Sequence, residues 1–361
     1  MSKITSVQGF AVRYNLPPEH QVGWKGGRIT ETHYVFVKIT SGEDRTGWGE
    51  IAGVYFAPEI YTHIINNKAK DFLVGKDAEN ITRIHQELHT FLISLGYSGL
   101  AKAVISGVDI ALHNLHCKPS HRAIKVRAYA STGFDQDTDR LCDQCRRAVE
   151  SGFQNIKIRG GFSVAEDIAR VRTARRCLGS SIGLMLELSQ PYASPRYAFS
   201  EVLRICKEIA EFDVLFVEEP FWPDDIDNYR KLAERTVVKI ACGENLYTDE
   251  QFKSFGPIVD VCQPDIGRMG GITSLARISK YCKAVAPHQF ANSVALYTLC
   301  RNVEKVKHFY MVEIDLLPNP LRDIVFGGTV RVVDGTLVAR DDGIPADLIA
   351  MAEKTPCQVN R

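Results

Sequence analysis

From residue 124 onward, the chain repeats one pattern eight times. A short apolar run comes first, a polar residue ends it, and an amphipathic helical stretch follows. The residues that end the eight runs lie 21 to 31 positions apart: Ser131, Lys157, Glu187, Glu218, Glu244, Asp265, His288 and Glu313. A strand, a loop and a helix take up about that length, and eight such units build a parallel (β/α)8 barrel. We therefore predict an α/β fold with a (β/α)8-type, modified TIM barrel over residues 125–315.

The residues before this repeat have a different organisation. The first 60 residues alternate apolar and polar side chains as strands do, and apolar residues between 58 and 116 recur at helical spacing. Strands followed by helices are typical of an α+β domain. We predict such a domain over residues 1–124, where it caps the barrel. Residues 316–361 do not continue the repeat, and we expect them to return to the capping domain.

Charge and hydropathy exclude several classes of partner. The 361 residues include 44 basic and 43 acidic side chains, for a net charge of +1. Because this balance gives no strong basic field, we predict neither nucleic acid nor a membrane as a partner. No apolar stretch approaches the ~18 residues that a membrane span needs, and the first residues do not resemble a signal peptide. We therefore expect a cytoplasmic location.

The ten cysteines are scattered along the chain. Several, such as Cys242 and Cys262, lie within apolar runs, so we expect buried free thiols in a reducing compartment. The only close pair is Cys142 and Cys145. It has no second pair to complete a zinc site, and we expect it to be structural.

Three carboxylates end consecutive predicted strands: Glu187, Glu218 and Glu244. Polar residues at the carboxyl ends of barrel strands point into the mouth of the barrel, so these three are expected to converge. Three anions repel one another unless a cation binds, and oxygen ligands suit Mg2+, with Mn2+ as a possible substitute. The alternative is that each glutamate lies on the rim and pairs with a nearby lysine or arginine.

The remaining strand ends suggest acid–base chemistry. Asp265 beside His288 would fix the imidazole tautomer and give a base or acid near neutral pH. Glu313 can hydrogen-bond an oxyanion if it is protonated, or it can be a buried salt-bridge partner. Lys157 and Arg159, on the opposite side, can hold a substrate carboxylate or enolate. Lysine can also act as a base, whereas arginine rarely does.

Motifs over nearly the whole chain carry a family resemblance: Gly47-Trp48-Gly49-Glu50, Asp109-Ile110-Ala111-Leu112, Ile156-Lys157-Ile158-Arg159-Gly160, Phe216-Val217-Glu218-Glu219-Pro220, Ala241-Cys242-Gly243-Glu244-Asn245, Gln263-Pro264-Asp265 and Pro287-His288. Together they resemble the mandelate racemase subgroup of the enolase superfamily. The resemblance implies that Glu187, Glu218 and Glu244 bind one Mg2+ per subunit. It also implies that Asp265 and His288 form the acid/base dyad, that Glu313 contacts the oxyanion, and that the protein is a homo-oligomer.

The sequence departs from the family pattern at two strand ends. The usual Lys-x-Lys of the second strand is Lys157-x-Arg159, so arginine stands in the usual position of a base. The usual Asp-x-Asn of the third strand is Glu187-Leu188-Ser189. A third departure, a shortened linker before the barrel, affects the capping domain and not the chemistry.

The family chemistry begins with removal of the proton α to a carboxylate, and nearby cations stabilise the enediolate that forms. Because Arg159 replaces one base, we predict a lyase that dehydrates an acid sugar, an aldonate or aldarate, to a 2-keto-3-deoxy acid. A racemase, epimerase or sugar-lactone cycloisomerase of the same subgroup is the alternative. A barrel that has lost catalysis and serves as a binding or structural protein is a hypothesis from another class.

The capping loops over residues 16–29 and 51–58 are expected to contact the distal part of a small-molecule carboxylate substrate. The candidate substrate-binding residues are His20, Trp24, Lys25, Arg28, Tyr55 and Phe56. Basic and aromatic side chains of this kind suit an anionic polyol.

Overall fold

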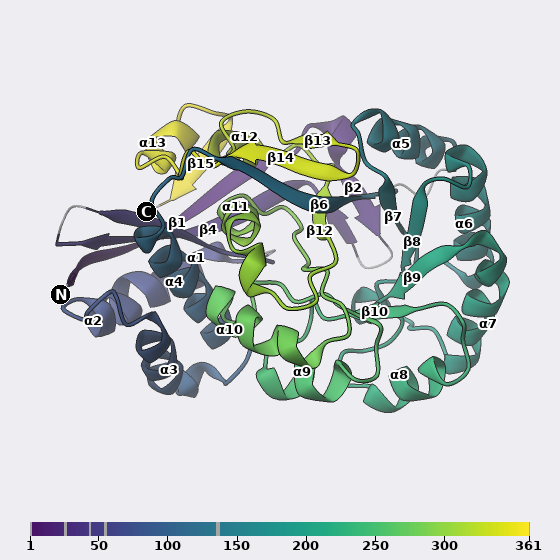
Figure 1. Ribbon diagram of the computed structural model, residues 1–361, viewed down its shortest axis with the longest axis horizontal. Coiled ribbons are helices and arrows are strands. Elements are labelled where there is room, and N and C mark those ends of the chain that lie inside the picture. Colours follow the sequence, from purple (N-terminus) through teal and green to yellow (C-terminus); the bar gives the residue numbers. More distant parts are fainter. Residues whose placement is uncertain (1, 25–26, 43–44, 54–55, 135–137, 361) are drawn as a thin grey trace.

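The computed structural model describes residues 2–24, 27–42, 45–53, 56–134 and 138–360. Figure 1 shows two units, a capping domain built around the N-terminal strands and a barrel that starts with β6. Both ends of the chain lie on the capping domain, because β15 (Cys357–Asn360) pairs with β1 (Ile4–Asn15).

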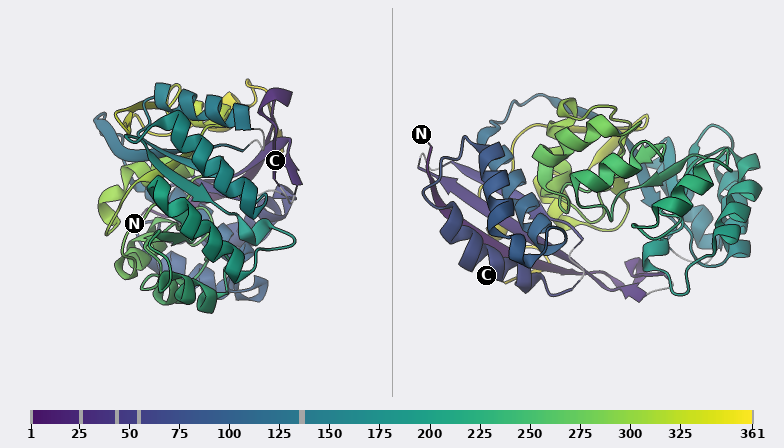
Figure 2. Two further views of the ribbon diagram at one scale, coloured as in Figure 1. Left: turned by 90° about the vertical axis from the view of Figure 1, so that its right-hand side faces the viewer. Right: turned by 90° about the horizontal axis from the view of Figure 1, so that it is seen from below.

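The capping domain is a four-stranded antiparallel sheet in the order β15–β1–β4–β5, with β4 over Glu31–Ser41 and β5 over Thr46–Ile51. The helices of this domain are α1 (Pro58–Ile64), α2 (Lys70–Leu73), α3 (Ile81–Phe91) and α4 (Leu100–His116). They cover one face of the sheet, and aliphatic side chains from both layers form the core between them (Figure 2, right). The predicted α+β organisation is confirmed.

Strand β5 shows how the two faces of this sheet differ. Gly47 and Gly49 point toward α4, where an added Cβ atom would lie 2.1 and 1.9 Å from carbonyl oxygens of that helix. Only glycine lets the helix approach the strand this closely. Trp48 and Glu50 point to the opposite face, because side chains alternate along a strand. Glu50 reaches the barrel there.

The barrel strands are β6 (Ala123–Thr132), β7 (Asn155–Arg159), β8 (Gly183–Glu187), β9 (Val214–Glu218), β10 (Ile240–Cys242), β11 (Val261–Cys262) and β12 (Val312–Asp315). Neighbours pair in parallel from β6 to β11, and β12 pairs in parallel with β6. The seventh strand is reduced to bridges from Val285 to Cys262 and to Phe309. Pro264 and Pro287, which follow the sixth and seventh strands, have no N–H to donate. Only their carbonyls continue the pairing, as acceptors from the N–H groups of His288 at 3.2 Å and Glu313 at 3.4 Å. The predicted barrel fold is confirmed, with its sixth and seventh strands very short.

The helices that follow these strands are α5 (Thr138–Glu150), α6 (Val164–Leu178), α7 (Phe199–Ile209), α8 (Ile226–Ala233), α9 (Asp249–Phe255), α10 (Gly271–Ile278) and α11 (Val294–Arg301). Short helical turns lie at 18–20, 65–69, 93–95, 190–192, 210–212, 279–281 and 303–305. Across the described residues, no helix combines the length and the apolar character that crossing a membrane requires.

The C-terminal segment contacts both units. After α12 (Pro320–Val325), β13 (Arg331–Val333) and β14 (Thr336–Arg340) form a hairpin, and β14 pairs antiparallel with the first half of β6. Helix α13 (Leu348–Ala352) then leads to β15 in the capping sheet. The segment therefore extends the sheet of the barrel before it reaches the capping domain.

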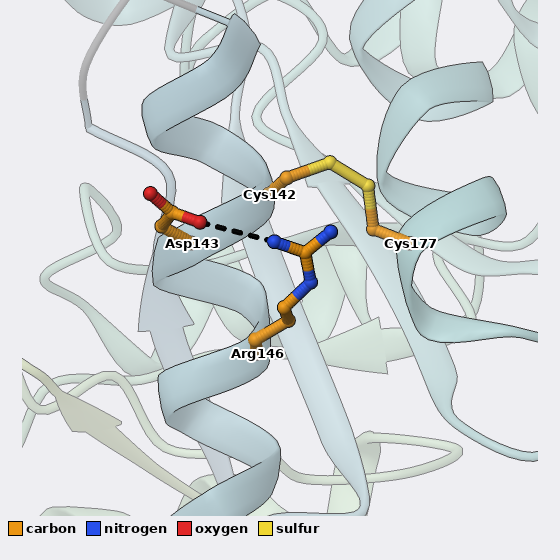
Figure 3. Close-up of a disulfide and its surroundings, with 4 residues drawn as sticks. All are labelled: Cys142, Asp143, Arg146 and Cys177. Carbon is orange, nitrogen blue, oxygen red and sulfur yellow. Dashed lines mark hydrogen bonds and ion pairs between the residues drawn. A yellow bond between two sulfur atoms is a disulfide. The ribbon is translucent and has the colours of Figure 1, made fainter.

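Two cysteines form a disulfide, so the expectation of free thiols was wrong for them. Cys142 on α5 is bonded to Cys177 on α6 (Figure 3). The two helices pack side by side and bring the Cα atoms to 5.8 Å, which is within the range of a disulfide. Cys145, three residues after Cys142, is buried and free. Since disulfides are typical of oxidising compartments, the cysteines do not support the cytoplasmic prediction.

We predict that alkylation of the unfolded, unreduced protein labels the eight cysteines that are free in the structure. Prior reduction should raise the number of labelled cysteines to ten. The intact mass of the protein measures both numbers. Ten labels without reduction would show that the disulfide is absent from the purified protein.

Helices α4 and α10 join the two units through a close polar contact. Asp109 on α4 accepts a hydrogen bond from the backbone N–H of Thr273 at 3.1 Å. Gly271, at the start of α10, has a φ of +75°, and an added Cβ atom would lie 2.2 Å from the carboxylate of Asp109. Gly271 therefore serves both an unusual backbone conformation and the approach of the two helices.

We predict that Gly271→Ala lowers the free energy of unfolding by roughly 2–4 kcal/mol, because the methyl group adds a clash with Asp109 to the cost of the positive φ. Gly75→Ala is the control. Gly75 has a φ of +86° and open space around it, so only the backbone cost of about 1 kcal/mol is expected. Urea unfolding measures both variants. Equal losses would show that the contact between α4 and α10 adapts without cost.

Candidate active site

The polar residues that were predicted at the strand ends lie together at the mouth of the barrel. Apolar side chains, among them Met185 and Phe216, fill the interior below them. Side chains two positions apart on a strand point to the same side. Glu187 and Glu218 therefore also point inward, one layer closer to the carboxyl ends of the strands. Glu313 lies two positions after Met311, another apolar residue of the interior, so Glu313 also points inward.

Glu187 ends β8, Glu218 ends β9, and Glu244 follows β10. One carboxylate oxygen of each lies within 4.8 Å of the others, and all three residues are buried. No other group of acidic, histidine or cysteine side chains among the described residues is arranged to hold a metal ion. Buried carboxylates this close repel one another unless a cation lies among them, and a set of oxygen donors suits Mg2+. The residues present therefore fit a magnesium ion.

Lys157 lies among these carboxylates. Its Nζ atom is 2.5 Å from Glu218 Oε1, 2.8 Å from Glu313 Oε1 and 3.0 Å from Glu187 Oε2. Burial alone would lower the pKa of Lys157, but Glu218 and Glu313 outweigh it and raise that pKa well above the ordinary value. In this arrangement Lys157 is a cation and not a base near neutral pH.

The two departures from the family pattern meet in one group of contacts. The Arg159 guanidinium contacts the Glu187 carboxylate directly and donates a hydrogen bond to Ser189 Oγ at 2.8 Å. The Ser189 hydroxyl in turn donates to Glu187 Oε1 at 2.8 Å. Arg159, Glu187 and Ser189 are therefore each in contact with the other two. An arginine that stays protonated cannot accept a proton from a substrate.

His288 and Asp265 form the pair that the sequence predicted, with Nδ1 of His288 2.8 Å from Asp265 Oδ2. The other carboxylate oxygen accepts a hydrogen bond from the N–H of Gly267 at 2.8 Å, which fixes Asp265. With Nδ1–H donated to Asp265, Nε2 is the atom that exchanges a proton within the site. Burial alone would lower the pKa of His288, but Glu244 and Glu313 outweigh it and raise the pKa.

Of the two roles predicted for Glu313, the structure shows the buried salt bridge. Besides its contact with Lys157, it accepts a hydrogen bond from the N–H of Gln289 at 3.2 Å. Burial alone would raise the pKa of Glu313, but Lys157 and His288 lower it to about 2. The carboxylate is therefore ionised here, and a contact between a protonated Glu313 and an oxyanion stays a prediction.

Three further side chains belong to the site, and the sequence analysis did not single them out. Gln263 donates to Glu218 Oε2 at 2.5 Å, and the Tyr192 hydroxyl donates to Glu244 Oε1 at 2.8 Å. Arg268 lies 3.8 Å from Glu244 Oε1. Burial alone would raise the pKa of Glu244, but His288 and Arg268 lower it to about 2. The signal in the sequence was position, because all three lie in the loops that follow barrel strands.

The capping hairpin, β2 (Val22–Trp24) and β3 (Gly27–Ile29), reaches across to the barrel near α5 and β6 (Figure 1). Its apolar residues pack on a small cluster between the two units, which comprises Phe134, Phe290 and Leu317 with Val22 and Ile29. The Phe290 ring stacks on that of His288, with centroids 6.5 Å apart, and the Arg159 guanidinium lies 5.4 Å from the Phe134 ring. The wall of the site beside the histidine and the arginine is therefore apolar.

The structure describes only some of the predicted substrate contacts. His20 and Arg28 line a cleft of 1110 Å³ between the hairpin and α5. Arg140 and Arg147 of α5 also line this cleft. Phe56 is exposed on its loop. The predictions for Lys25, Tyr55 and the side chain of Trp24 fall outside the described part of the chain.

Two family models match this chain. The mandelate racemase / muconate lactonizing enzyme, N-terminal domain matches residues 9–125, and the enolase C-terminal domain-like model matches residues 140–346. The chain belongs to the enolase superfamily. The resemblance that the motifs carried is thereby confirmed.

The relatives of this chain in the enolase superfamily are named for different reactions. An arabinonate dehydratase of Saccharolobus solfataricus is 28% identical over 326 residues, which is 85% of this chain and 86% of that protein. A D-galactarolactone cycloisomerase of Agrobacterium fabrum is 26% identical over 94% of both chains. A crystal structure of an enolase superfamily member from Polaromonas sp. JS666 superposes with a TM-score of 0.85, at 26% identity over 97% of both chains.

We predict that changing any one of the three clustered glutamates of this enolase superfamily member to glutamine weakens Mg2+ binding by a factor of ~10 or more, because affinity depends on the charge of the ligands. Titration calorimetry measures the affinity for Glu187→Gln, Glu218→Gln and Glu244→Gln. Glu208→Gln, on the surface of α7, is the control and should bind Mg2+ as the unchanged protein does. An unchanged affinity in Glu187→Gln would remove Glu187 from the metal site.

Proposed function

We propose that this chain is a magnesium-dependent acid-sugar dehydratase, a lyase that converts an aldonate or aldarate to a 2-keto-3-deoxy acid. The proposal combines the family membership, the relatedness to an arabinonate dehydratase and the arrangement of bases and cations in the site. That arrangement is the observation that carries the choice of reaction.

Among the residues that the structure describes, the proton acceptor we assign lies on one side of the site. His288 is paired with Asp265 on that side. On the other side, the Arg159 guanidinium is a poor proton acceptor. Lys157 contacts Glu313, which does not belong to the metal cluster, at 2.8 Å, and this carboxylate favours the charged form of the lysine. A racemase that works through two bases needs a proton acceptor on each face. A single acceptor supports elimination, because the histidine that takes the α-proton can return a proton to the leaving group.

The proposed reaction uses His288 twice. Nε2 of His288 takes the proton α to the substrate carboxylate, and Asp265 stabilises the imidazolium through Nδ1–H. The positive charges of Lys157 and Arg159 stabilise the enediolate. The imidazolium then protonates the β-hydroxyl as the carbon–oxygen bond breaks, so that water leaves and an enol forms, which becomes the 2-keto acid. Because one histidine serves both steps, the elimination is syn.

The residues that would hold the metal are Glu187, Glu218 and Glu244. When bound there, Mg2+ supplies a Lewis acid that stabilises negative charge on the carboxylate oxygens of the substrate. The surrounding cations, Lys157 and Arg159, act together with that charge and position the carboxylate beside His288.

The walls of the site support a substrate with two different ends. The reacting carboxylate would face Lys157 and Arg159, next to the rings of Phe134 and Phe290. Carbon–hydrogen groups of the sugar chain can pack on those rings. The distal end would reach toward the cleft that His20 and Arg28 line, where basic side chains suit hydroxyl groups or a second carboxylate.

A sugar-lactone cycloisomerase is the second candidate. The D-galactarolactone cycloisomerase relative aligns over more of this chain than the dehydratase does, 94% against 85%. Abstraction of an α-proton by His288 would be common to both reactions. The product separates them, since a dehydratase forms a 2-keto acid from an open-chain acid sugar and releases water.

We predict that the protein, screened with Mg2+ against a library of aldonates, aldarates and their lactones, forms a 2-keto acid that semicarbazide detects. In D2O, His288→Asn should abolish both the product and exchange of the α-proton, because no second base is present. Arg159→Met should slow turnover through poorer stabilisation of the enediolate.

His63→Asn on α1 is the matched control and should keep wild-type rates, because His63 is exposed on the capping domain. Continued exchange in His288→Asn would show that Lys157 or another group is the base. Exchange with neither a 2-keto acid nor loss of water would favour a racemase or epimerase.

A further inference from the structure

The acid/base pair is carried by the two parts of the barrel with the fewest strand hydrogen bonds. Asp265 follows β11, which has two residues, and His288 follows the isolated bridge at Val285. Residues 286–293 belong to no strand or helix. Around His288 the backbone is held by single bonds, from the N–H of His288 to the Pro264 carbonyl at 3.2 Å and from the N–H of Glu313 to the Pro287 carbonyl at 3.4 Å. Beyond His288 the segment depends on contacts with side chains.

At its end, the segment that holds His288 donates hydrogen bonds to a carboxyl group of the capping domain. Glu50, at the end of β5 in the capping domain, is almost fully buried. It accepts hydrogen bonds from the N–H of Ser293 at 2.9 Å, the N–H of Ala295 at 2.7 Å and the Ser293 hydroxyl at 3.0 Å. These donors belong to the start of α11 and to the residue just before it.

Helix α11 has no side-chain cap of its own. Ser293 stands at the N-cap position, but its side chain makes no hydrogen bond to the helix and donates to Glu50 instead. Free N–H groups and the helix dipole at this end both favour a negative group. Glu50 supplies a carboxyl group there across the boundary between the two domains. Burial raises the pKa of Glu50 to about 7, against the hydrogen bonds from Ala295 and Ser293, which lower it.

The loop that holds Asp265 has the same kind of support. The Ser106 hydroxyl on α4 accepts a hydrogen bond from the N–H of Gly270 at 2.7 Å, next to the contact of Asp109 with the start of α10. Two residues after Glu50, the N–H of Ala52 donates to the carbonyl of Gly267 at 3.2 Å. The N–H of Gly267 is the donor that fixes Asp265.

We propose that Glu50 is a positioning residue for His288. Its carboxyl group fixes the start of α11, and thereby the far end of the irregular segment that holds the imidazole against Asp265. Asn292, next to Ser293, donates a hydrogen bond to the side chain of Gln289 at 3.1 Å and so connects the start of the helix to the residue after His288. The capping domain is then part of the acid–base machinery as well as the wall over the substrate.

The chemistry of the contact explains why a carboxylate is needed. All three groups that face Glu50 are donors, and a glutamate accepts all of them. A glutamine oxygen in the same place could accept from the two N–H groups, but its NH2 group would face the Ser293 hydroxyl, which would have to change from donor to acceptor. The change Glu50→Gln keeps the size of the side chain and removes this match, which makes it the primary test.

The first readout does not depend on any substrate. In protein labelled with 15N-histidine and loaded with Mg2+, the ring signals of His288 are assigned by their loss in His288→Asn. The unchanged protein should show one tautomer with the proton on Nδ1. In Glu50→Gln, these signals should shift toward the average of two tautomers or broaden, since the ring is no longer fixed against Asp265.

The second readout rests on the proposed function and uses its substrate. Glu50→Gln should lower kcat by a factor of 10 or more while KM and the affinity for Mg2+ change less than threefold. Glu201→Gln is the matched control, because Glu201 is also a carboxylate at the start of a helix, α7, but lies on the surface. It should match the unchanged protein in both readouts.

Ser293→Ala keeps the test decisive if Glu50→Gln folds poorly. It removes one of the three hydrogen bonds and should give a smaller loss of kcat with the same effect on the His288 signals. Unchanged His288 signals and an unchanged kcat, in variants that are merely less stable to heat, would overturn the proposal and leave Glu50 a purely structural residue. If no substrate is found, the proposed function fails, and the His288 signals still decide the role of Glu50.

Discussion

A carboxylate can be buried only where a cation or several hydrogen-bond donors face it, and this requirement organises the whole mouth of the barrel. Glu218 meets Lys157 and Gln263, and Glu313 meets Lys157 and a backbone N–H. Glu50 meets three donors at the start of a helix. No carboxylate of this set is left to the low-dielectric interior alone. The cations and donors that stabilise these buried carboxylates also determine which groups of the site can exchange a proton.

The consequence is an asymmetric site. Lys157 and Arg159 lie on one side with Glu187 and Glu218, whereas His288 on the other side is held by Asp265 and has Nε2 3.2 Å from Glu244. The substitutions that distinguish this chain from the family pattern fit that division. Arg159 replaces the usual lysine. It contacts Glu187, which replaces the shorter aspartate, and it donates a hydrogen bond to Ser189, which replaces the usual asparagine. None of the three would be equally well accommodated without the others.

Much of this arrangement was predictable because it follows from local patterns. The spacing of apolar runs indicated the barrel, and the position of Glu187 and Glu218 at the carboxyl ends of predicted strands placed them at its mouth. Contacts that depend on how helices and loops pack were not predictable. The bond between Cys142 and Cys177 joins residues that are 35 positions apart on two different helices. Tyr192 and Arg268 lie in loops whose paths no periodicity describes. Strand pairing also stopped earlier than the apolar runs suggested, because proline follows the sixth and seventh strands.

The pairing of β1 with β15 has a consequence for the order of folding. It joins Ala11 to Asn360, so it cannot form until nearly the whole of this sequence has been synthesised. Contacts between residues so far apart along a chain form slowly. Until then, the outer edge of β1 is an unpaired template for other strands. Asn66 protects part of that edge, because its side-chain amide accepts from the N–H of Gly9 at 2.7 Å and donates to the Gly9 carbonyl at 3.1 Å. Asn66 thus covers a part of the edge outside the pairing with β15, which runs from Ala11 to Tyr14.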